Sequence, residues 1–76
     1  MRVEVAYARP DRQRLVTLDL PAGATARDAA RASGLVDEFP EIDPERAPLG
    51  VFGRACAGHT VLRAGDRVEI YRPLQV

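Results

Sequence analysis

The chain has 76 residues, with 11 arginines balanced by 11 acidic side chains and no lysine. This length fits one domain, residues 1–76, and leaves no room for a deep substrate cavity. The balanced charge argues against nucleic-acid binding, which usually comes with a basic excess, and no apolar run approaches the roughly 20 residues of a membrane-spanning helix. Cys56 is the single cysteine and the start shows no signal-peptide pattern, so we expect a cytoplasmic protein without an internal disulfide.

Two stretches near the start, residues 2–8 and 14–20, alternate between apolar and polar side chains. This period of two is typical of half-buried strands. One face of the first stretch carries Val3, Val5 and Tyr7, and one face of the second carries Val16, Leu18 and Leu20. The polar residues 9–13 between them include a proline and predict the turn of an antiparallel hairpin.

A helix is predicted to begin after Thr25. The Thr25 hydroxyl can accept a hydrogen bond from the backbone N–H of Asp28, and the Asp28 carboxylate suits the positive end of the helix dipole. The helical face that would meet a sheet is nearly all alanine, and Gly34 is suited to end the helix in the left-handed conformation. The larger apolar residues that follow are expected to supply the missing bulk: Leu35, Val36, Phe39 and Ile42.

The last part of the chain predicts shorter elements. Residues 38–48 predict an ordered surface loop, residues 49–53 a short strand, and residues 60–62 a further strand or a tight bend. Residues 67–71 alternate strongly and predict a final strand, which Pro73 would end because it has no N–H to donate. The predicted order is β-β-α-β-(β)-β. It favours an α+β fold of the β-grasp type, with one helix across one face of a mixed four- or five-stranded sheet.

Residues 62–74 have the sequence LRAGDRVEIYRPL. This stretch resembles the signature of the RnfH family, also called RatB, which comprises small bacterial proteins of the ubiquitin-like superfamily. Further resemblance lies in residues 5–8, 29–35, 39–43 and 50–54. It implies a ubiquitin-like fold, like that of the small sulfur carriers. It also implies an unsettled function, because gene neighbourhood alone associates the family with an Rnf electron-transport cluster or a ribosome-associated toxin.

The resemblance breaks down at the end of the sequence. Similar family members continue beyond Pro-Leu with a basic tail, whereas this sequence stops at Val76. Sulfur carriers and ubiquitin-type modifiers end in Gly-Gly, since glycine permits the close approach needed to activate the terminal carboxylate. The rigid and bulky residues 72–76 therefore argue against carrier chemistry. A degenerate sulfur carrier, and a toxin–antitoxin or ribosome-associated factor, stay open as alternatives.

Other groupings of polar or small residues indicate no chemistry. Cys56 and His59 are three residues apart, but a structural zinc site needs four ligands and a Cys–His catalytic pair needs a third, orienting group. The acidic residues of the 38–45 segment lack the spacing of a calcium loop. The glycines from position 50 onward lack a phosphate-binding pattern. We therefore expect no catalytic residue, no metal and no cofactor, hence a protein that is not an enzyme.

The outward face of the predicted sheet is the best candidate for function. By alternation it carries Glu4, Ala6, Leu15, Thr17, Arg67, Glu69 and Tyr71. Because tyrosine and arginine are favoured at binding hot spots, the predicted contacts with an unidentified protein partner are Tyr71, Arg67, Glu69, Arg72 and Leu74. The alternative is an ordinary solvated face with cross-strand Arg–Glu pairs. Residues 16–20 are also a candidate sheet edge that accepts a partner strand, and the oligomeric state stays open.

Overall fold

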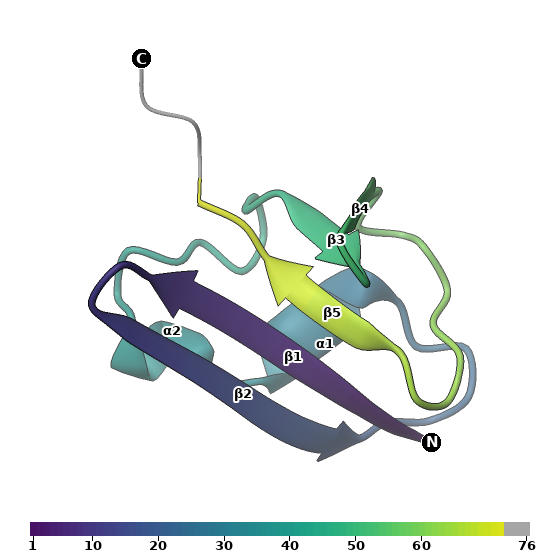
Figure 1. Ribbon diagram of the computed structural model, residues 1–76. Helices are drawn as coiled ribbons and strands as arrows, with labels where there is room; N and C mark the ends of the chain where they lie inside the picture. Colours follow the sequence, from purple (N-terminus) through teal and green to yellow (C-terminus); the bar gives the residue numbers. More distant parts are fainter. Residues whose placement is uncertain (73–76) are drawn as a thin grey trace.

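The computed structural model describes residues 1–72 of the chain. Within them, the strands are β1 (Arg2–Arg9), β2 (Arg12–Asp19), β3 (Leu49–Val51), β4 (Arg54–Cys56) and β5 (Arg67–Ile70), and the helices are α1 (Ala26–Ala32) and α2 (Leu35–Glu38). Helix α1 crosses behind β1 and β5 in the view of Figure 1, and α2 lies beside the β1–β2 hairpin. Neither helix is long and apolar enough to cross a membrane.

The five strands form one mixed sheet in the order β2-β1-β5-β3-β4. Strand β1 pairs antiparallel with β2 and parallel with β5, while β3 pairs antiparallel with both β4 and β5. The predicted β-grasp layout is thereby confirmed. The first strand, β1, and the last strand, β5, pair with each other at the centre of the sheet. Strand β2 lies at one edge of the sheet, as expected.

The core lies between the sheet and α1. The predicted alternation is confirmed, because Val3, Val5 and Tyr7 of β1 are buried, as are Val68 and Ile70 of β5. The alanine face of α1 is buried against them, and its small side chains allow helix and sheet to approach closely. Bulk comes from residues after the helix, as the sequence predicted: Leu35, Phe39 and Ile42 are all buried.

The start of α1 has the predicted reciprocal cap. The backbone N–H of Asp28 donates to the Thr25 hydroxyl at 3.1 Å, and the backbone N–H of Thr25 donates to the Asp28 carboxylate at 3.0 Å. Gly34 has the expected left-handed conformation, with φ of +69°, just after the C-cap residue Ser33. The chain then turns directly into α2, which was not predicted because four residues are too few to show a helical period.

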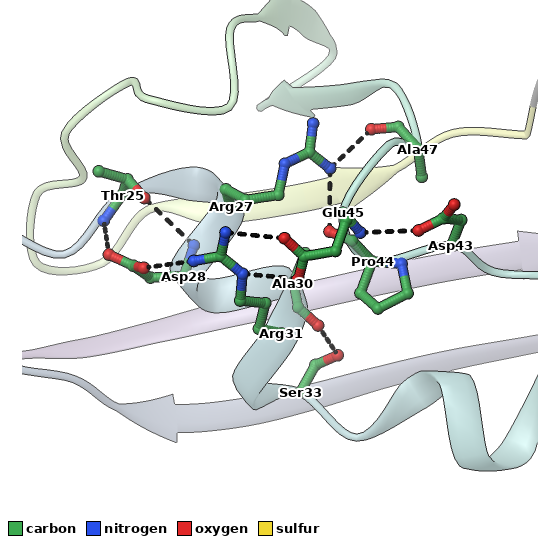
Figure 2. Close-up of polar contacts among 10 residues, drawn as sticks. All are labelled: Thr25, Arg27, Asp28, Ala30, Arg31, Ser33, Asp43, Pro44, Glu45 and Ala47. Atoms are coloured by element: carbon green, nitrogen blue, oxygen red, sulfur yellow. Dashed lines mark hydrogen bonds and ion pairs between the residues drawn. The ribbon is translucent and has the colours of Figure 1, made fainter.

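Two arginines of α1 hold the loop that leads to β3, as Figure 2 shows. The Arg27 guanidinium donates to the backbone carbonyls of Pro44 at 3.1 Å and Ala47 at 2.9 Å. Arg31 makes a two-pronged contact with the Glu45 carboxylate at 2.7 and 2.8 Å. These contacts explain why the polar segment of residues 38–48 is an ordered loop, as expected, although most of it has no regular structure.

The first hairpin is tighter than the sequence predicted. Its loop is Pro10-Asp11 alone, because Arg9 and Arg12 still pair with each other. Their guanidinium carbons lie 5.1 and 5.3 Å from the centre of the buried Phe39 ring, so both side chains extend over the core instead of entering the turn. The prediction of a five-residue turn was wrong because it treated these arginines as loop residues.

The extra strand also lies elsewhere than expected. Residues 60–62 make only an isolated bridge, between Val61 and Thr25. The additional strand is β4, which a two-residue loop, Phe52-Gly53, folds back against β3. Its three residues carry no alternating pattern, so the sequence offered no periodic signal for it, and the strand predicted over residues 49–53 ends at Val51.

The cap of α1 predicts a pH dependence of stability. Hydrogen bonds from the backbone and side chain of Thr25 lower the pKa of Asp28 below its ordinary value. Since the folded pKa is depressed, the stabilisation is present at neutral pH and is lost as the pH falls through about 4 and below. In Asp28→Asn, which keeps an acceptor but cannot titrate, the free energy of unfolding should fall less steeply over this range. Chemical denaturation at several pH values checks this, and parallel curves for both proteins would contradict it.

Candidate functional site

The outward sheet face, which is turned toward the viewer in Figure 1, carries an open groove of about 540 Å³. It is not the deep cavity that chain length argues against, but its volume lies within the range of ligand sites. The groove extends over the second half of β1, the start of β2, and β5. The described residues that line it are Ala6, Tyr7, Ala8, Gln13, Arg14, Leu15, Arg67, Glu69, Ile70, Tyr71 and Arg72.

Tyr71 lies across the backbone of β3 at one side of this groove. A side chain at Gly50 would place its Cβ 2.7 Å from the Cε2 and Cζ atoms of the Tyr71 ring, a distance that real contacts do not allow. The absence of a side chain at Gly50 therefore creates the space for the ring. The backbone N–H of Tyr71 donates to the carbonyl of Pro48 at 2.8 Å, which also fixes the backbone from which the side chain extends.

Glu69 holds the other end of the Tyr71 side chain. The Tyr71 hydroxyl donates to Oε1 of Glu69 at 2.7 Å, and the same oxygen accepts the backbone N–H of Gly53 at 2.9 Å. This hydrogen bond, followed by burial and the negative charge of Glu69, raises the pKa of Tyr71 above its ordinary value. The phenol thus stays protonated at neutral pH and its ring is held in one orientation.

Arg67 lies on the same face but is already paired. Its Nε donates to Oε1 of Glu4 at 2.9 Å, and the two residues are direct neighbours across the parallel β1–β5 pair. This is the cross-strand Arg–Glu pair expected for an ordinary solvated face. The Arg67 side chain is nevertheless 44% exposed, so its remaining N–H groups can still meet a partner.

The remaining two predicted contacts are Arg72 and Leu74. Arg72 follows Tyr71 directly, and its charge also acts near Tyr7 and Glu41. The pKa of Glu41 is lowered by hydrogen bonds from its own backbone and from Tyr7, and further by the charges of Arg9 and Arg72. Arg72 also lines the end of the groove. Leu74 lies outside the described residues.

Phe52 was missed as a candidate surface residue because the sequence placed it inside a strand. It is at the tip of the β3–β4 hairpin and is 60% exposed. Its φ is +48°, which is the left-handed region that bulky residues rarely adopt. The available signal was the Phe-Gly pair at positions 52 and 53, but two-residue hairpin loops are usually recognised from Asn-Gly.

Cys56 and His59 do not form a site with a third group. Within residues 1–72, no three His, Cys, Asp or Glu side chains are grouped so that they could hold a metal ion. Cys56 is half-buried at the edge strand β4, where its side chain packs against the core. The candidate functional surface is therefore the outward sheet face together with the adjoining β3–β4 hairpin.

Comparison with curated proteins supports one family. The family model described as "RnfH family Ubiquitin" matches residues 1–76. A UPF0125 protein of Chromobacterium violaceum is 64% identical over 74 residues, which are 97% of this chain and 74% of that protein. Protein RnfH of Laribacter hongkongensis is 60% identical over 72 residues, which are 95% of this chain and 67% of that protein.

Solved structures agree on the fold. SAMP1 of Haloferax volcanii matches with a TM-score of 0.75 at 20% identity, over 100% of this chain and 99% of that one. A putative molybdopterin converting factor, subunit 1, of Pyrococcus furiosus matches with a TM-score of 0.70 at 25% identity, over 96% and 98%. A domain-swapped dimer of protein HI0395 from Haemophilus influenzae matches with a TM-score of 0.59 at 41% identity, over 100% and 95%. On the family match and these identities, the chain belongs to the RnfH family of ubiquitin-like proteins.

Proposed function

We propose that this RnfH-family chain is a non-catalytic protein-interaction module of the bacterial cytoplasm. The observation that carries the proposal is the fixed position of Tyr71 beside the open groove. Its ring lies over Gly50 and its hydroxyl is bonded to Glu69. A side chain that is already ordered loses little conformational entropy when a partner covers it, which favours binding.

The chemistry of the groove supports binding over catalysis. On the outward face, the described lining residues contribute the polar side chains of Gln13, Arg67, Glu69 and Tyr71, and no Ser, Cys or His is among the described lining residues. The Glu69 carboxylate already accepts two hydrogen bonds and is committed to local structure. The groove therefore offers an aromatic surface and hydrogen-bond donors, which suit a protein surface with apolar and acidic groups.

The β2 side of the groove adds apolar contact area. Leu15 is 46% exposed there, next to Ala6 on the paired strand. Strand β2 is an edge strand within the described chain, so its outer backbone groups are not taken up by another strand of the sheet. A partner on the outward face can therefore extend to this edge and add backbone hydrogen bonds to the side-chain contacts.

Affinity capture from the native bacterium, followed by binding measurements with the purified partner, tests the proposal. Tyr71→Ala should weaken binding by about 1 kcal/mol or more, since an ordered aromatic anchor is lost. Gly50→Ala should also weaken binding, because the new methyl group displaces the Tyr71 ring from its position. Arg67→Ala should have a smaller effect, as Arg67 already pairs with Glu4.

Val61→Ala is the matched control. Val61 is 61% exposed and does not line the groove, so its loss should leave the affinity unchanged. Isothermal titration calorimetry measures all four variants against the same partner. Affinity that is unchanged in both Tyr71→Ala and Arg67→Ala would reject the outward face as the binding site.

Sulfur transport is a second candidate function, favoured by the likeness to the molybdopterin converting factor subunit of Pyrococcus furiosus. Such a role requires a thiocarboxylate at the C-terminus. Incubation of the full-length natural protein with an adenylating enzyme, ATP and a sulfur donor, followed by intact mass measurement, tests it. The interaction-module proposal predicts an unchanged mass, whereas replacement of one terminal oxygen by sulfur would support the carrier function.

A further inference from the structure

We infer that Phe52, at the tip of the β3–β4 hairpin, is a protruding anchor that inserts into an apolar, acid-rimmed pocket of a folded protein partner. This inference rests on the proposed function, since it adds a second contact to the partner that covers the outward sheet face. It concerns a residue that the groove itself does not include.

The two phenylalanines of the chain have opposite environments. Phe39 is fully buried, lies 4.8 Å from Tyr7 between ring centroids, and is covered by two arginines. Phe52 is 60% exposed, and within residues 1–72 no aromatic ring or guanidinium group stacks on it. Its ring therefore gains little from burial in the free protein, although a large apolar surface is available for burial in a complex.

The backbone at Phe52 is also unfavourable for this residue type. Phe52 and Gly53 have φ values of +48° and +81°, as in the type I′ turns that join two strands by two residues. Glycine adopts this region freely, and asparagine does so far more readily than a bulky aromatic residue. Phe52 thus combines backbone strain with exposure, and neither feature stabilises the isolated domain.

Neighbouring contacts keep the turn from relaxing. The backbone N–H of Phe52 donates to the carbonyl of Arg67 at 3.2 Å, and the N–H of Gly53 donates to the Glu69 carboxylate at 2.9 Å. Both acceptors belong to β5, the central strand next to β3. The hairpin tip is therefore held in place, and the Phe52 ring is presented on a rigid support, which reduces the entropy cost of its insertion.

The charge beside the hairpin identifies the rim of the matching pocket. Arg54 follows the turn directly and is exposed, and within residues 1–72 no carboxylate lies at ion-pair distance from it. Arg67, whose carbonyl anchors the turn, is already paired with Glu4, so among the described residues Arg54 supplies the unpaired positive charge beside the hairpin tip. Electrostatic complementarity then requires carboxylates around the pocket that receives Phe52.

The stability of the free protein gives the first test. Phe52→Asn replaces a strained residue by one that the turn favours, so the melting temperature should rise by about 4 °C or more. Val61→Asn is the control, since Val61 is equally exposed but has no positive φ, and it should give no rise. A lower melting temperature in Phe52→Asn would overturn the inference, because Phe52 would then stabilise the fold itself.

Photo-crosslinking gives the second test. The photoreactive residue p-benzoylphenylalanine replaces Phe52, or Val61 as the control, in the full-length protein in the native bacterium. We expect a discrete, nuclease-resistant protein adduct at position 52 and none at position 61, joined to a peptide with apolar and acidic residues. Arg54→Glu should reduce this adduct several-fold, and Arg46→Glu, on the loop before β3, should not.

The outcomes separate this inference from the proposed function. A complex that depends on Tyr71 but gives no adduct at position 52 overturns the hairpin contact and leaves the interaction module standing. An adduct at position 52 without any dependence on Tyr71 supports the hairpin contact and rejects the outward face. An adduct that nuclease removes contradicts a protein pocket in favour of a nucleic acid, and the absence of any complex overturns both proposals.

Discussion

The hydrogen bonding of the Glu69 carboxylate is the interaction on which the proposed binding surface depends. This carboxylate lies on the central strand β5 and accepts hydrogen bonds from the Tyr71 hydroxyl and the Gly53 backbone N–H. One side-chain oxygen thereby connects the aromatic ring beside the groove with the turn that presents Phe52. Because the carboxylate already accepts these hydrogen bonds within the domain, we expect it to hold Tyr71 and the hairpin turn in position. The direct contacts with a partner are then made by Tyr71 and Phe52.

This arrangement is possible because the inner face of the sheet forms the core, which leaves the outer face exposed. The inner face is covered by the alanine stripe of α1 and by bulky residues such as Phe39, which together form a thin but complete core. In the part of the chain that the structure describes, no helix covers the outer face, and Gly50 leaves space there for Tyr71. A small domain of this kind can therefore stabilise its fold on one side and present an ordered surface on the other.

The strands and the cap of α1 could be predicted because each has a local physical signal. Alternation placed Val3 and Val68 in the core, and the spacing of Thr25 and Asp28 predicted the cap. The tight first turn could not be predicted, because Arg9 and Arg12 are polar in sequence yet pack over a ring that lies about thirty residues away. Strand β4 depends on pairing with β3 and carries no pattern of its own.

The same distinction applies to the candidate site. Alternation correctly placed Arg67, Glu69 and Tyr71 on one face, but it cannot show that Tyr71 lies over Gly50, since that contact depends on the β3–β5 register. Phe52 was missed because it is a candidate contact only on account of its exposure and its positive φ, which are properties of the folded hairpin. Residue type and period thus predicted the face, and tertiary structure defined the surface on it.

The pKa of Tyr71, measured by a spectroscopic pH titration, tests the role of Glu69 most directly. In the natural protein the pKa should lie above its ordinary value of about 10, because the phenol donates to a carboxylate and is partly buried. In Glu69→Gln, which keeps the shape but removes the charge, the pKa should fall back toward that value. A Tyr71 pKa that is ordinary in the natural protein, or unchanged by the substitution, would contradict the account.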